Sequence, residues 1–412
     1  MYLESILKRS FDGYLVFSKG SQVVRQRARG KCTLFSDSRS EVIASFNPSR
    51  AFTNAFGLAM SGLNVNGFDI ELEGKTTKGE IIQATKLFLY SMPRSFKTGG
   101  KFRFKPKFVN CKTVLIKKGV LADDVRIRYI LNNFDIGELR NDRSFTYGSL
   151  KFQVVCYTEY KENLKKLKKF SGVLPTSMLI CDKGGISEVY VDRVVQRSLD
   201  FLSFAKSAHI SYVLKEIVDD SGNYELNFAD NTVMPCRFGY DILDFNGHKM
   251  KDIVYPGLCN YVWIQRKYNL MHLIQLYLDA LTPFFGDSRA MLMSVVFEAL
   301  KHNYKKYCLK NNQREKVQFR NRNHRWKDKD FKKILIELFN EEGFKFRKKE
   351  LDFIKRVRNP TLHEGKFRNF KRGYDIFYLE RHLFERFILH LIGYKGSYGK
   401  CSSEGTKMLV MH

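Results

Sequence analysis

The spacing of apolar residues changes once along this chain of 412 residues, and that change constrains the fold more than any other feature. Up to about residue 185, short runs of β-branched and aromatic residues are bounded by Gly, Ser, Asn and Asp, which is typical of strands. From about residue 260 onward, apolar residues recur at helical spacing. The sequence therefore predicts an α+β protein, with a β-rich N-terminal domain over 1–260, an all-α helical bundle over 261–395 and a loose tail over 396–412.

The first part of the chain carries the strand signals. The four clearest predicted strands cover 14–17, 32–35, 41–46 and 152–157. One amphipathic helix is expected from Ser187, followed by a hairpin whose strands are 211–215 and 224–228. The N-terminal domain is therefore itself expected to be α+β.

The segment 101–108 alternates basic and aromatic residues, which on a strand places the basic ones on one face. These basic residues are Lys101, Arg103, Lys105 and Lys107. We favour an edge strand that its lysines keep soluble, with Pro106 preventing further pairing. The alternative is a basic face that contacts phosphates.

The second part of the chain is punctuated as a series of helices. The predicted helices cover 265–281, 287–309, 329–341, 346–358 and 374–394. Pro283 and Gly286 separate the first pair, and Gly343 and Gly365 separate later ones.

The charge of the chain indicates a polyanionic partner. Lys and Arg number 71 against 43 Asp and Glu, a formal net charge of +28. Residues 301–412 contribute 29 basic against 13 acidic residues, so more than half of the excess lies in the helical part. A positive charge of this size creates an electrostatic field that attracts RNA, DNA or an anionic membrane surface as a partner. Of these partners, we favour nucleic acid.

The densest basic stretch, 314–333, joins two predicted helices. It contains four residues that can hold phosphates and stack on a base: Arg320, Arg322, Arg325 and Trp326. RNA binding by this loop and a merely solvated, mobile loop are both compatible with the sequence.

The cysteines and histidines indicate neither a metal nor a disulfide framework. The eight cysteines are spread singly, with no C-x-x-C pair and no clustered histidines, so we expect no metal site and no cofactor. The first residues do not resemble a signal peptide, and no apolar run approaches the length of a membrane span. We expect a cytoplasmic protein without a membrane partner.

The sharpest motif is Arg356-Val-Arg-Asn-Pro-Thr-Leu-His-Glu-Gly365. Cleaving RNA without a metal requires proton transfer, and His363 has a side chain suited to it near neutral pH. The guanidinium of Arg358 is a bidentate partner for a phosphate whose charge grows in the transition state. Because Pro360 lacks an N–H, we expect the helix to break here, with Asn359 as the N-cap of a new turn.

Two other interpretations remain open, one for the motif residues and one for the N-terminal region. Arg358 can pair with a helix carboxylate while His363 is a buried structural histidine. Nucleotide binding by the N-terminal region is the weakest possibility, because Glu73-Gly-Lys-Thr-Thr77 lacks the first glycine of a phosphate-binding loop.

The helix 295–300 followed by the Arg-Asn-x-x-x-His motif resembles the HEPN superfamily, and within it the Apea-like proteins of bacterial abortive-infection systems. That resemblance implies a metal-independent endoribonuclease that cuts single-stranded RNA and works as a homodimer. Transfer RNA loops are the substrate we consider, because their bases are unpaired. It implies that Arg358 and His363 are catalytic, that Asn359 orients them and that Glu298 is the acidic residue facing the motif. Arg356, just before the motif, is expected to bind RNA.

The resemblance also implies a biological setting, anti-phage defence. The N-terminal domain is expected to restrain the nuclease until a phage-derived trigger arrives. The alternative is a non-catalytic nucleic-acid-binding or dimerisation module with an inactive bundle, because Pro360 and Glu364 depart from the family pattern.

Overall fold

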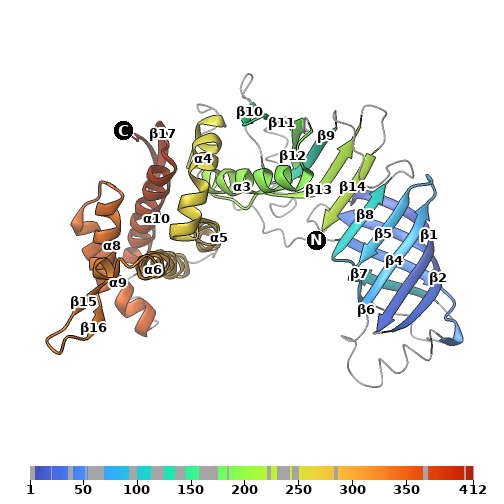
Figure 1. The fold of residues 1–412 in the computed structure, drawn as a ribbon, viewed down its shortest axis with the longest axis horizontal. Coiled ribbons are helices and arrows are strands. Elements are labelled where there is room, and N and C mark those ends of the chain that lie inside the picture. The colour runs from blue at the N-terminus through green and yellow to red at the C-terminus, as the bar shows by residue number, and fades with distance from the viewer. Residues whose placement is uncertain are drawn as a thin grey trace. The chain divides into compact units, whose positions relative to one another are not determined.

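The computed structural model describes most of the chain (Figure 1). Its description excludes 1–4, 20, 36–39, 52, 54–68, 92–99, 113–124, 135–143, 157–174, 183–184, 220–223, 230–241, 244–249, 283–285, 365–369, 403–404 and 412. In α9 and α10, 357–364 and 370–374 are described by their backbone alone, as are a few residues at the ends of other elements.

The chain forms two compact units, each built from several segments. Unit 1 comprises 1–136, 148–191 and 211–236, and unit 2 comprises 137–147, 192–210 and 237–412. The boundary expected near residue 260 lies within a helix, α4, which spans Lys251–Tyr268. The expected order holds at the coarse level, with a large antiparallel sheet preceding the helices along the chain.

Unit 1 is built from antiparallel strands. They are β1 (Ser5–Lys19), β2 (Gln22–Phe35), β3 (Ser40–Phe46), β4 (Asp69–Thr76), β5 (Ile81–Thr85), β6 (Phe88–Ser91), β7 (Gly100–Lys105), β8 (Phe108–Lys112), β9 (Arg126–Asn132), β11 (Leu150–Cys156), β12 (Pro175–Asp182), β13 (Ser211–Val218) and β14 (Tyr224–Ala229). Each of the four strand runs expected from the sequence lies in one of these strands, apart from residue 157, which is outside the described residues.

The strands of unit 1 form one sheet in the order β11-β12-β9-β13-β14-β8-β5-β4-β1-β2-β3-β7-β6. Buried side chains alternate with exposed ones along β7 and with half-buried or exposed ones along β3, as expected for strands with one face on a core. Buried apolar residues of β1 to β5, β7 and β8 join one core cluster, which includes Leu15, Leu34 and Phe102. This core is the main source of stability in unit 1.

The basic strand around residue 101 has the predicted alternation but not the predicted position in the sheet. Lys101, Arg103 and Lys105 are exposed, whereas Phe102 and Phe104 are buried. The expectation of an edge strand is wrong, because β7 pairs with β3 on one side and with β6 on the other. The short strand β6, which the sequence did not indicate, forms backbone hydrogen bonds with the outer side of β7.

The helix and hairpin expected after residue 187 are confirmed. Helix α3 spans Glu188–Lys206, and β13 pairs with β14 in antiparallel register. Most of α3 belongs to unit 2, although its first residues belong to unit 1. A buried lysine, Lys215 of β13, forms an ion pair with Glu188 at the start of α3.

Unit 2 is mainly helical. Its elements are β10 (Ser144–Tyr147), α4 (Lys251–Tyr268), α5 (Leu270–Leu281), α6 (Gly286–Lys310), α7 (Arg314–Val317), β15 (Gln318–Arg320), β16 (Trp326–Asp328), α8 (Phe331–Glu341), α9 (Lys348–Glu364), α10 (Phe370–Ile392), β17 (Ser397–Ser402) and β18 (Gly405–Val410). The predicted first helix, 265–281, is two helices. Asn269 separates them because its backbone is left-handed, with φ of 54°.

The C-terminal residues contradict the expected loose tail. Strands β17 and β18 form a hairpin with Lys400 opposite Lys407. Tyr398 is 3% exposed and stacks on His382 of α10, with ring centroids 5.9 Å apart. The tail is therefore part of unit 2, and the burial of an aromatic ring holds it there.

The core of unit 2 is rich in aromatic residues from helices α3 to α10. Tyr277 of α5 stacks on Phe384 of α10, and Phe297 of α6 meets the same ring edge-on. All three side chains are buried. Within the described parts of the chain, no helix is long and apolar enough to cross a membrane.

Candidate functional site

The Arg-Asn-x-x-x-His motif lies at the C-terminal end of α9. The expected break at Pro360 is wrong, because α9 runs without interruption from Lys348 to Glu364. Asn359 is therefore inside the helix and is not an N-cap. A proline interrupts one backbone hydrogen bond, and the helical backbone continues past that gap here, as it does at Pro256 inside α4.

A continuous helix fixes the relation between positions 358 and 363. Five residues correspond to about 7.5 Å along the helix axis and about 140° around it. The structure describes α9 only as backbone from 357 onward, so the side chains of Arg358, Asn359 and His363 lie outside the described residues.

The first half of α9 is anchored in the helical core. Leu351 and Ile354 are fully buried, and α9 packs against α6, α8 and α10. Two ion pairs also hold α9. Asp352 of α9 pairs with Lys332 of α8, and Lys355 of α9 pairs with Asp330, the residue just before α8. Arg356, a residue expected to bind RNA, is exposed two residues before Arg358.

Glu298, the acidic residue expected to face the motif, lies in the middle of α6. Its carboxylate forms an ion pair with Lys301, one turn further along the same helix. A pairing of this kind within one helix gives Glu298 a structural role. Helix α6 does pack against α9, so Glu298 stays on an element adjacent to the motif helix.

Within the basic stretch 314–333, residues 318–328 form a β-hairpin between α7 and α8, which corrects the expected loop. Strands β15 and β16 pair so that Arg320 lies opposite Trp326, and the hairpin extends away from the helices of unit 2 (Figure 1). The guanidinium carbons of Arg314 and Arg320 lie 5.5 and 5.1 Å from the centre of the Trp326 ring. A cation at this distance from an indole is held by the ring quadrupole.

The tip of the hairpin is a hydrogen-bonded turn. The Asn321 side-chain oxygen accepts from the backbone N–H groups of Asn323 and Arg325. The side chains of Arg322 and Arg325 are exposed beside it. The four residues of this stretch that are expected to bind RNA therefore lie on one small element, whereas Arg356 lies on helix α9.

A buried polar network fixes α10 against α5 and against the residue that follows α3. Glu385 accepts hydrogen bonds from Arg381 and Tyr277, and Arg381 also donates to Ser207 at 3.0 Å. Burial raises the pKa of Tyr277, so its hydroxyl stays protonated and donates. The network makes the register of the central helices specific.

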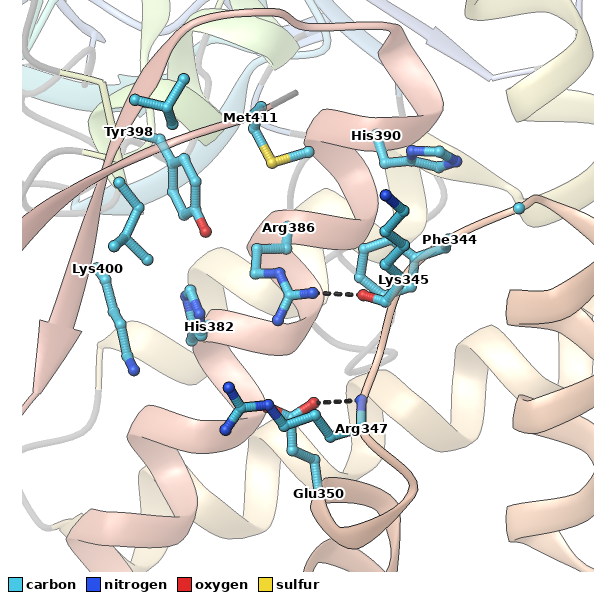
Figure 2. Close-up of a pocket in the computed structure, with 13 residues that line it drawn as sticks. Phe344, Lys345, Arg347, Glu350, His382, Arg386, His390, Tyr398, Lys400 and Met411 are labelled. Atoms are coloured by element: carbon cyan, nitrogen blue, oxygen red, sulfur yellow. Dashed lines mark hydrogen bonds between the residues drawn. The ribbon is translucent and has the colours of Figure 1, made fainter.

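The fold brings together one group of residues that the sequence did not indicate as a site. His382, Arg386, Lys345 and Lys400 line a cavity within unit 2 (Figure 2). They come from α10, from the segment between α8 and α9, and from β17, so no local spacing in the sequence could have indicated them.

Among the described residues, no group of three or more His, Cys, Asp or Glu side chains is placed to hold a metal ion. Comparison of the chain with protein-family models, with curated proteins and with solved structures found no match.

Proposed function

We propose that this chain is a metal-independent endoribonuclease of the HEPN type. Two copies cut single-stranded RNA, such as the exposed loops of transfer RNA, in the bacterial cytoplasm during anti-phage abortive infection. Unit 1 restrains the site until a phage-derived trigger binds it. The observation that carries the proposal is the Arg-Asn-x-x-x-His sequence on the last turns of α9, in the most basic part of the chain.

The proposed chemistry uses the RNA as its own nucleophile. The 2′-hydroxyl attacks the adjacent phosphorus and the 5′-oxygen leaves, which gives a 2′,3′-cyclic phosphate and a 5′-hydroxyl. His363 transfers the proton in this step, and Arg358 stabilises the charge that develops on the phosphate. Asn359 orients the pair, and Glu298 supplies a carboxylate from the adjacent helix.

The continuous helix favours a site shared between two chains. Positions 358 and 363 are about 140° apart around the helix, so they lie on different faces of it. A second chain can then supply the partner that each position lacks on its own face. Two copies can pair Arg358 of one chain with His363 of the other. A helix anchored by Leu351 and Ile354 provides a rigid base for such a site.

The exposed hairpin supports RNA as the substrate. The indole of Trp326 is half-buried and lies close to the guanidinium groups of Arg314 and Arg320. The stacking of a base on this indole would add to phosphate contacts from Arg322 and Arg325. This same hairpin favours a second candidate function, RNA binding without cleavage.

The deciding experiment is cleavage of total cellular RNA by the purified full-length chain in EDTA. Wild type should give discrete products with 2′,3′-cyclic phosphate ends, and His363→Ala should bind RNA equally but give none. His272→Ala, which removes an exposed histidine from α5, is the matched control and should cut normally. A His363→Ala variant that cuts as well as wild type would refute the catalytic assignment.

If neither protein cuts, the same assay is repeated with extract from phage-infected cells. Cleavage by wild type alone under that condition supports a restrained nuclease. RNA binding without cleavage in both conditions supports the binding module instead.

A further inference from the structure

The cavity beneath the C-terminal hairpin has the composition of an anion site. It measures about 540 Å³ and lies between α10, the start of α9 and the hairpin β17–β18 (Figure 2). Four cationic side chains line it, together with a single carboxylate, Glu350. The cations are Lys345, Arg347, Arg386 and Lys400.

The one carboxylate is already engaged in a structural role. Glu350 is the third residue of α9, and its side chain accepts a hydrogen bond from the backbone N–H of Arg347 at 3.1 Å. This is the reciprocal half of a helix capping box. One of its oxygens therefore serves the start of the helix, and its single negative charge leaves the lining with an excess of positive charge.

The cations, in contrast, have few acidic partners. Arg386 donates to the backbone oxygen of Lys345 and lies over the ring of Phe344, its guanidinium carbon 5.2 Å from the ring centre. Within the described part of the chain, the side chains of Lys345, Arg347 and Lys400 form no ion pair. Four cations around a shared space repel one another unless an anion occupies it.

A buried histidine gives independent support for a ligand. His382 is 6% exposed and lines the cavity, and its Nδ1 atom is buried with no hydrogen-bond partner among the described residues. A buried polar atom without a partner costs stability, so native proteins seldom keep one without a reason. Burial, together with Arg386 and Lys400, lowers the pKa of His382 to about 3, so the ring is neutral near pH 7 and still offers one N–H.

The remaining walls are apolar and suit a flat organic group. Tyr398, Phe344, Leu409 and Met411 line the same cavity as the cations. Its volume lies within the range of roughly 300–1,000 Å³ that is usual for small-molecule sites. A ligand that matches both parts of the lining has a multiply charged anionic end and a planar, weakly polar end.

We propose that this cavity binds a nucleoside polyphosphate, with its phosphates on Lys345, Arg386, Lys400 and His382 and its base against the apolar wall. The site is separate from the proposed nuclease motif, because Glu350 and position 363 are 13 residues apart on α9, about 20 Å along the helix. The proposal therefore does not depend on RNA cleavage.

The test is calorimetric titration of the full-length chain with ATP and GTP, and with inorganic phosphate as the probe for the anionic part alone. We expect at least one nucleotide to bind more tightly than phosphate, and phosphate to compete with it. Lys400→Glu should weaken nucleotide binding by about tenfold or more, as expected for losing a charge-assisted contact. Lys395→Glu, at an exposed position outside the cavity, should not.

His382→Phe separates ligand binding from folding. Phenylalanine keeps the stacking on Tyr398 and removes the nitrogen that lacks a partner, so stability should not fall while nucleotide affinity does. His363→Ala should bind nucleotide as wild type does, which distinguishes this site from the nuclease motif. The proposal is overturned if no nucleotide binds, if phosphate binds as tightly as the nucleotides, if Lys400→Glu binds normally, or if only RNA binding responds to that variant.

Discussion

Replacing Arg381 with Met should destabilise unit 2 by about 3–5 kcal/mol. The Arg381 side chain is 5% exposed, and its Nε lies 2.5 Å from a carboxylate oxygen of Glu385, whose side chain is fully buried. Removing the guanidinium leaves that carboxylate with the Tyr277 hydroxyl as a remaining donor. Breaking a buried ion pair from one side carries a penalty of this size, because the remaining charge stays desolvated.

The double variant Arg381→Met with Glu385→Leu tests the cause of that loss. It removes both charges, so it should lose only about 1–2 kcal/mol, chiefly for the acceptor taken from Tyr277. Urea unfolding followed by tryptophan fluorescence is the assay, because Trp263 and Trp326 both belong to unit 2. A double variant that loses as much as the two single variants together would show that the residues do not act as a pair.

Three further outcomes follow from individual contacts. Burial raises the pKa of Glu341, but hydrogen bonds from lysine and tyrosine neighbours outweigh burial and hold this pKa at about 2, below the usual 4.5. The stabilising effect of the Glu341 carboxylate should therefore be complete above pH 4.5 and decline as the pH falls toward 2. Urea midpoints measured from pH 3 to 6 should rise with pH in wild type and rise less in Glu341→Gln. Trp326→Ala should weaken binding of single-stranded RNA by about tenfold in a gel-shift titration, whereas Trp263→Ala should bind as wild type does. Gly257→Ala should lower the thermal midpoint, because a Cβ there would lie 2.8 Å from ring atoms of the fully buried Phe201; an unchanged midpoint would show that the ring can move.

The strands and most helices were predictable because local patterns determine them. The alternation around Phe102 and Phe104 and the helical spacing of α3 both record which face is buried. The hairpin β13–β14 was predictable because a segment rich in turn-forming residues separates its two strands in the sequence.

The errors share a different cause, contacts between residues distant in sequence. Pro360 indicated a break, but the loss of one hydrogen bond is small beside the packing that anchors α9 through Leu351 and Ile354. The C-terminal segment has no long apolar stripe, and its order depends on Tyr398 meeting His382 of α10. The cavity was invisible because it requires three separate segments to meet.

The motif itself was readable from the sequence, whereas its surroundings were not. Arg358 and His363 stand out by residue type and spacing, and their chemistry is a proposal that rests on that spacing. The ion pair between Glu298 and Lys301 was not foreseen, because the residue types alone do not show which neighbour on the helix the carboxylate will contact.

The way the chain is shared between the two units has a consequence for protein engineering. The chain passes from one unit to the other five times, so neither unit is a continuous stretch that one cut could release. A fragment beginning at residue 261 would lack most of α4 and the part of α3 that places Phe204 against Tyr277. Such a fragment would expose buried aromatic rings and is expected to aggregate. Removing the N-terminal part by genetic truncation is therefore not a clean test of the proposed restraint, and point substitutions in the intact chain are the better tool.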